Sequence, residues 1–162
     1  MMIRSSALAL VLAACALPGA AMSAETLQVS ETGLGPITAA TPLDRDAIQR
    51  LFPGSTVTTD TTQGVPVAII QGPGDLLVYA WGDEGGVYAA TASGANVRGP
   101  KGEKTGDALS SLQNGTLSCR FGAEVVTCYS ADMRMIEYTV YQPVGTDSRV
   151  AAIGWRRLAP RR

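Results

Sequence analysis

Between residues 55 and 92 the chain is divided about every ten residues by glycine-rich turns, and this spacing constrains the fold more than any other feature. The turns are Gly64, Gly72–Asp75 and Gly82–Gly86. Such spacing indicates antiparallel meanders rather than βαβ units. After a first strand at Leu27–Val29, the expected strands are Ser55–Asp60, Val65–Gln71, Leu76–Trp81, Val87–Ala92, Thr116–Phe121, Val125–Tyr129, Arg134–Tyr141 and Arg149–Trp155.

Two short segments are typical of helices. The first strand should end at the turn Gly33–Pro36, after which Thr41 suits the N-cap of a helix and Pro42 its first position. An apolar stripe then continues to Phe52, and the proline that follows should end the helix. A second short helix is expected at Asp107–Gln113, before the pair Asn-Gly.

The predicted fold class is therefore mainly β, with antiparallel sandwich-like sheets and two short helices. An alternative is an α+β fold made of two halves, each a helix followed by a meander. Gly35-Pro36 and Thr41 recur as Gly99-Pro100 and Thr105, with an offset of 64 residues, and each set leads into an expected helix. Three matching positions leave open whether the halves arose by duplication.

The N-terminus has the pattern of an export signal. Arg4 precedes the apolar run Ala7–Leu17, which is too short to span a bilayer but suits a signal peptide, and nothing downstream is long and apolar enough to span one. Leu-Ala-Ala-Cys fits a lipobox ending at Cys15, whereas small residues near 19–23 suit ordinary cleavage. The expected organisation is a signal at 1–24, or a lipoprotein signal at 1–14 with a tether to residue 25, followed by one mainly β domain at 25–162.

The two remaining cysteines, Cys119 and Cys128, are nine residues apart on either side of a glycine. This spacing across an expected hairpin predicts a disulfide, which is typical of an oxidising, exported compartment. A redox or metal-binding pair is the alternative. It lacks a C-x-x-C spacing and any histidine, and no third cysteine is left as a ligand once Cys15 is removed or acylated.

The segment VSETGLGPITAATPL (Val29–Leu43), the cysteine pair and the closing Ile153–Arg157 occur in this order along the chain. Together they resemble an uncharacterised family of bacterial envelope lipoproteins regulated by the envelope-stress sigma factor RpoE. The resemblance implies an exported, mainly β protein that is lipid-anchored, here at Cys15. It implies no catalytic residue, because the family has no established activity. The apolar residues after Cys15 differ from the usual polar tether and leave the cleavage question open.

The composition excludes several classes of function. Without histidine, Ser-His-Asp and Cys-His catalysis and His-ligated zinc are excluded. Removal of Arg4 with the leader leaves 12 basic and 14 acidic side chains, a charge of −2 that argues against a nucleic-acid partner. Gly99–Thr105 resembles a phosphate loop, but Glu103 separates the second glycine from the lysine, so a solvated charged loop is expected.

No other group of residues predicts a site. Asp83-Glu84 in a glycine turn should point to solvent, and no metal ligand or cofactor is expected. Asp132, Glu137 and Asp147 have no spacing that predicts convergence. The aromatic residues are expected to pack in the core or on the sheet rather than bind ligands; they are Tyr79, Trp81, Tyr88, Tyr138 and Trp155.

The expected function is that of a non-catalytic cell-envelope protein that binds or supports another envelope component, either a protein or part of the cell wall. It is expected on the periplasmic side of the envelope, as an outer-membrane lipoprotein or a soluble periplasmic protein. One alternative is an inhibitor of a cell-wall enzyme such as lysozyme, for which the loop Ser93–Ala95 would be the first contact to test. Another is a carboxylate-based hydrolase. The ligand and the oligomeric state are left open.

Overall fold

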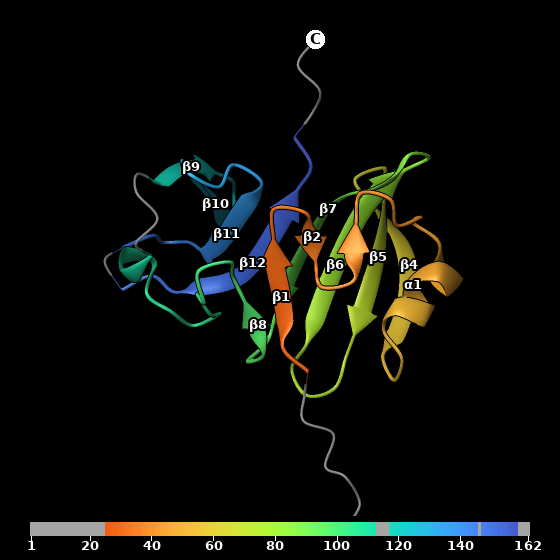
Figure 1. The fold of residues 1–162 in the computed structure, drawn as a ribbon. Coiled ribbons are helices and arrows are strands. Elements are labelled where there is room, and N and C mark those ends of the chain that lie inside the picture. Colours follow the sequence, from red (N-terminus) through yellow and green to blue (C-terminus); the bar gives the residue numbers. More distant parts are fainter. Residues whose placement is uncertain (1–24, 113–116, 146, 159–162) are drawn as a thin grey trace, which may run out of the picture.

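The computed structural model describes residues 25–112, 117–145 and 147–158 of the chain. Both forms of the leader, with the proposed lipidation site Cys15, lie outside these residues. The described part is mainly β, as predicted, with two antiparallel-rich sheets in a sandwich-like arrangement, one α-helix and one 3-10 turn (Figure 1). Among the described residues no helix is long and apolar enough to cross a membrane.

The larger sheet has eight strands in the order β4-β5-β6-β7-β12-β11-β10-β9, and every neighbouring pair is antiparallel. It consists of two four-stranded meanders, each in chain order, that meet where β7 pairs with β12. In chain order the strands are β4 (Thr56–Thr62), β5 (Val65–Gln71), β6 (Leu77–Asp83), β7 (Gly86–Ser93), β9 (Leu117–Phe121), β10 (Val125–Ser130), β11 (Ile136–Tyr141) and β12 (Val150–Arg156).

The smaller sheet covers one face of the larger one and has the order β3-β2-β1-β8 (Figure 1). Its β1/β8 pair is parallel, which is the exception to the expected antiparallel pairing. The turn predicted at Gly33–Pro36 is partly wrong, because its first two residues form a strand and pair with Ile37 and Thr38. The four strands are β1 (Leu27–Ser30), β2 (Gly33–Leu34), β3 (Ile37–Thr38) and β8 (Val97–Arg98).

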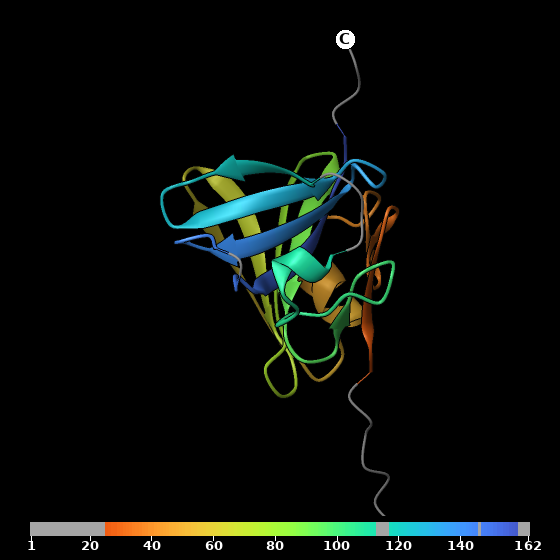
Figure 2. The same cartoon turned by 90° about the vertical axis from the view of Figure 1, so that its left-hand side faces the viewer.

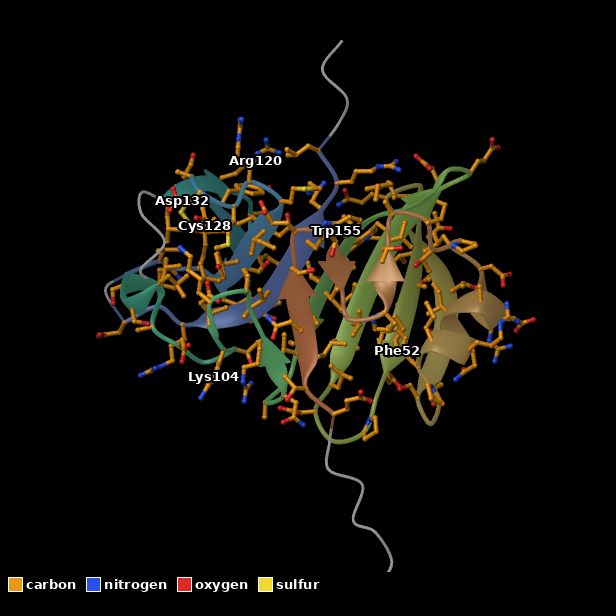
Figure 3. All side chains as sticks on the ribbon, viewed as in Figure 1. Phe52, Lys104, Arg120, Cys128, Asp132 and Trp155 are labelled. Carbon is orange, nitrogen blue, oxygen red and sulfur yellow. A yellow bond between two sulfur atoms is a disulfide. The ribbon has the colours of Figure 1, made fainter. Side chains whose placement is uncertain are left out.

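The hydrophobic core lies between the two sheets. Alternate residues of each large-sheet strand point into it, as the period of two requires. Trp155 of β12 is 1% exposed, and its indole N–H donates to the backbone oxygen of Glu31 at 3.0 Å, which fixes the β1–β2 turn to the large sheet (Figure 3). Trp155 and Tyr138 are fully buried, so the expectation that these two aromatic residues belong to the core is confirmed.

The first helix, α1 (Arg45–Leu51), begins later than the sequence suggests. Its N-cap is Asp44, whose carboxylate accepts a hydrogen bond from the Ala47 backbone N–H at 2.8 Å. The predicted N-cap, Thr41, is wrong because its hydroxyl instead accepts from the Thr38 backbone N–H at 2.9 Å. A local rule could not choose between two capping residues only three positions apart, since the choice depends on the contact of Thr41 with Thr38 of β3.

The second predicted helix is a single 3-10 turn, η1 (Leu109–Ser111), within the described part of the segment. The preceding loop, Gly99–Thr105, is exposed at Lys101, Gly102 and Lys104, as expected of a solvated loop, but it buries its carboxylate. Glu103 is only 8% exposed and accepts a hydrogen bond from the buried Tyr138 hydroxyl at 2.6 Å. Its other carboxylate oxygen accepts from the Lys101 backbone N–H at 2.7 Å. The hydrogen bond between Tyr138 and Glu103 therefore connects the loop to β11.

The large sheet is strongly curled. In Figure 2, β9–β11 run across the molecule at a steep angle to β4–β6, and the smaller sheet lies on the opposite side. Twist accumulates between neighbouring strands, so a sheet of eight strands bends round on itself unless something flattens it. The face of the sheet that does not meet the core is therefore concave.

Candidate functional site

The concave face of the large sheet forms an open groove of about 490 Å³, which we call the concave groove. It is lined by the alternate strand residues that point away from the core, and the two ends of the sheet both contribute. Side chains near the β4–β5 hairpin and side chains of β10 and β11 line the same hollow, which reflects the curl of the sheet. The lining residues are Thr62, Gln63, Val65, Leu77, Tyr79, Trp81, Tyr88, Ala89, Thr91, Ser93, Val125, Thr127, Glu137, Thr139, Tyr141, Ala151, Ala152 and Arg156.

Aromatic rings form one part of the lining. Tyr79 and Trp81 are two residues apart on β6 and therefore share a face of the sheet. Their ring centroids are 6.0 Å apart and the ring planes differ by 17°, so the two rings are stacked. Both rings are partly exposed, as is Tyr88, and Tyr141 is 69% exposed. Tyr79, Trp81 and Tyr88 were expected to pack in the core or on the sheet, and they also line the groove.

Hydroxyl groups and small side chains form most of the remaining surface. Thr91, Thr127 and Thr139 stand on three strands of the central part of the sheet and are partly exposed. Alanines lie between them. Such a surface offers hydrogen-bond donors and acceptors next to flat apolar ring faces. Such a surface is chemically suited to a molecule that has both apolar and polar faces.

An ion pair lies in the floor of the groove. Glu137 of β11 is 3% exposed, and its carboxylate accepts a hydrogen bond from Nε of Arg156 at 3.2 Å. Partial burial acts to lower the pKa of Arg156, but the Glu137 charge and hydrogen bond outweigh it and the pKa is raised. The guanidinium is therefore charged at every physiological pH. A Cβ at Gly154 would lie 2.6 Å from Cγ2 of Thr91 and 3.0 Å from Cγ of Glu137, so these two side chains leave room only for glycine between them.

A second hollow, of about 390 Å³, adjoins the concave groove, because Arg156 lines both. We call it the arginine pocket. Arg120 comes from β9, Arg134 from the turn before β11, and Arg156 from the end of β12. In Figure 3, Arg120 projects at the end of the molecule where β12 also ends. The complete lining is Ser118, Arg120, Tyr129, Ser130, Ala131, Arg134, Arg156 and Leu158.

The disulfide predicted between Cys119 and Cys128 is present. The two residues lie directly opposite each other on β9 and β10, with their Cα atoms 4.0 Å apart (Figure 3). The bond lies on the core face of the sheet, which is the face opposite the arginine pocket. There it links the two strands of the β9–β10 hairpin. A disulfide is typical of a protein in an oxidising, exported compartment.

The weaker sequence features fall elsewhere. Asp83 is exposed, and its carboxylate accepts from the Gly85 backbone N–H at 2.8 Å, which is ordinary turn geometry. In the part of the chain that the structure describes, no three Cys, Asp or Glu residues are grouped as metal ligands. The loop Ser93–Ala95 is held from two sides, since Asp75 accepts from Ala95 N–H at 3.0 Å and Thr105 donates to the Gly94 carbonyl at 2.7 Å.

Sequence reasoning missed the Glu137–Arg156 pair, the groove and the arginine pocket. The signal for the groove is present, because positions 77, 79 and 81 alternate with buried positions, as do 125, 127 and 129 and also 139 and 141. Aromatic and hydroxyl residues repeat on that second face. The convergence of Arg120, Arg134 and Arg156 has no such signal, since it requires β9, β10, β11 and β12 to lie side by side in the sheet.

The chain is similar in structure to the uncharacterized protein yfeY from Escherichia coli, whose crystal structure superposes with a TM-score of 0.62. The two are 23% identical, and the match covers 82% of this chain and 99% of that one. No protein-family model matches the sequence, and a search of curated proteins finds no match. The structural likeness shows that the two chains share a fold.

Proposed function

We propose that the protein is a non-catalytic binding protein of the bacterial cell envelope and that it holds a saccharide chain of the envelope in its concave groove. The observation that carries this proposal is the stacked, partly exposed pair Tyr79 and Trp81 beside a field of threonine hydroxyls. A sugar ring has apolar C–H faces and a polar rim. Aromatic faces match the first, and hydroxyl groups match the second.

The groove suits a saccharide better than a lipid chain. A hydrocarbon tail needs an enclosed apolar lining, because each buried hydroxyl without a partner costs free energy. Thr91, Thr127, Thr139 and Ser93 would face such a tail directly. A saccharide can form hydrogen bonds with the same groups, and an open groove lets a chain extend beyond it.

Binding is also favoured over the carboxylate hydrolase. A glycoside hydrolase uses two carboxyl groups that flank the bond, about 5 to 10 Å apart. Among the described residues that line the groove, Glu137 is the single carboxylate, and Arg156 is paired with it. One carboxylate that is already paired with an arginine does not supply the two carboxyl groups that this reaction uses.

The envelope location is part of the same proposal. The Cys119–Cys128 disulfide supports export. We propose further that Cys15 is lipidated and that the chain is a member of the RpoE-regulated lipoprotein family that it resembles. The intact mass of protein from the native envelope tests the anchor. A start at Cys15 with added diacylglycerol is expected, and an unmodified start between residues 22 and 25 would contradict it.

Calorimetric titration with the N-acetylglucosamine tetramer, and sedimentation with purified peptidoglycan sacculi, test the groove. We expect native protein to bind and Trp81→Ala to bind about tenfold more weakly, since one stacked ring contributes on the order of 1–2 kcal/mol. The matched control is Phe121→Ala, an aromatic residue that is 70% exposed and points to the other face of the sheet. Absence of binding to both probes, or an equal loss in Phe121→Ala, would overturn the proposal.

A further inference from the structure

We infer that the arginine pocket binds a phosphate monoester carried by the saccharide in the concave groove, so that the ligand is a phosphorylated sugar. This inference rests on the proposed function, because the two hollows share Arg156 and form one continuous surface.

The charge of the pocket is the first observation. The whole chain is nearly neutral, with 13 basic and 14 acidic side chains, yet three arginines and no carboxylate are found among the described residues that line this hollow. Glu137 lies at the boundary and balances Arg156 at 3.2 Å. Arg120 and Arg134 have no hydrogen-bond or ion-pair partner within the described part of the chain. The pocket therefore presents two uncompensated positive charges.

The hydrogen-bonding capacity is the second observation. The bond to Glu137 uses Nε of Arg156, and the terminal nitrogens of that guanidinium form no hydrogen bond among the described residues. With Arg120 and Arg134, they supply forks of N–H donors, which match oxyanions in two-point geometry. Ser118 and Tyr129 add hydroxyl groups to the lining.

The number of donors favours phosphate over carboxylate. A carboxylate has two oxygens with about four lone-pair sites, whereas the three terminal oxygens of a phosphate monoester offer about six. Three guanidinium groups that approach from β9, β12 and the turn before β11 can each use a separate pair of sites. A tetrahedral dianion fits this arrangement better than a planar group that carries one charge.

Because the two hollows are continuous, they determine which part of the ligand lies in each. Arg156 stands between the arginine pocket and the aromatic part of the groove, where Tyr88 also lies. A sugar placed against Trp81 and Tyr79 can therefore direct a phosphate substituent toward Arg120 and Arg134. The groove would supply affinity for the ring, and the arginines would select the phosphorylated form.

Calorimetric titrations of the full exported protein with four probes test the inference: glucose 1-phosphate, glucose, glucuronate and inorganic phosphate. We expect glucose 1-phosphate to bind about tenfold or more tightly than glucose, since charge-assisted hydrogen bonds to the phosphate are stronger than neutral ones. Arg120→Ala with Arg134→Ala should remove this difference. Arg50→Ala, an exposed arginine of α1, is the matched control and should leave it unchanged.

The possible results are distinct. Equal binding of glucose 1-phosphate and glucose would overturn this inference and leave the saccharide proposal standing. Glucuronate as tight as glucose 1-phosphate would overturn the preference for phosphate. Binding of inorganic phosphate as tight as glucose 1-phosphate, with no effect of Trp81→Ala, would show a site for free phosphate and would contradict the saccharide proposal itself. Circular dichroism of each variant confirms that the fold is retained.

Discussion

The hydrogen bond between Tyr138 and Glu103 should be a main support of the loop that precedes η1. Tyr138→Phe removes only the hydroxyl that donates to the Glu103 carboxylate at 2.6 Å. The acceptor residue is 8% exposed, so water replaces the lost donor poorly. A hydrogen bond to a charged group contributes about 1.5–3 kcal/mol, so we expect the free energy of unfolding to fall by about 2 kcal/mol. For a domain of this size the melting temperature should fall by about 6 °C.

Urea unfolding followed by circular dichroism measures this change. Tyr141→Phe is the matched control, because the Tyr141 side chain is 69% exposed and its hydroxyl should contribute less than about 0.5 kcal/mol. In a Glu103→Gln background the same Tyr138→Phe change should cost only about 1 kcal/mol, since the acceptor is then neutral. A loss for Tyr138→Phe no greater than that of the control would refute the role of the buried pair.

Three further changes test other parts of the fold. Cys119→Ser should reduce the free energy of unfolding by about 2.5 kcal/mol, because it opens a short loop, and unreduced native protein should show no free thiol at Cys119 or Cys128; reactive thiols at both would disprove the bond. Gly33→Ala should cost about 2 kcal/mol or more, because its Cβ would overlap a backbone carbonyl of β3, whereas Gly145→Ala, which meets open space, should be nearly neutral in thermal melts. Asp44→Ala should cost about 1 kcal/mol by loss of the α1 N-cap, and an unchanged melting temperature would show that the cap is dispensable.

The two meanders of the large sheet give the chain an internal regularity. The first half has three short strands of the smaller sheet, then α1 and four antiparallel strands, whereas the second half has one short strand, then the 3-10 turn η1 and four antiparallel strands. The alternative prediction of two halves, each a helix followed by a meander, therefore describes the order of elements well. Common descent of the halves stays a hypothesis, because the order of elements alone does not establish it.

Local chemistry in the sequence determined the strands and the disulfide. The period of two and the glycine turns depend only on neighbouring residues, and for that reason β5 has the predicted bounds Val65–Gln71. The cysteine spacing across a hairpin is also local, since β9 and β10 are consecutive strands. The helix predicted at Asp107–Gln113 is only the 3-10 turn η1 in the described part of that segment. Its N-cap residue forms no side-chain hydrogen bond, so little in the local sequence stabilises a longer helix.

Only the tertiary structure decided the pairings between distant segments, and the candidate site depends on them. The pairing of β7 with β12 joins the meanders, and the parallel pairing of β1 with β8 spans about 70 residues of chain. Neither pairing can be predicted from a local sequence pattern, since every strand offers the same backbone hydrogen-bonding groups to a neighbour. Arg120, Arg134 and Arg156 line one hollow only because β9 to β12 lie side by side, and that arrangement also brings Glu137 of β11 next to Arg156 of β12. Twist accumulated over eight strands made the groove, and that is a property of the whole sheet rather than of any segment.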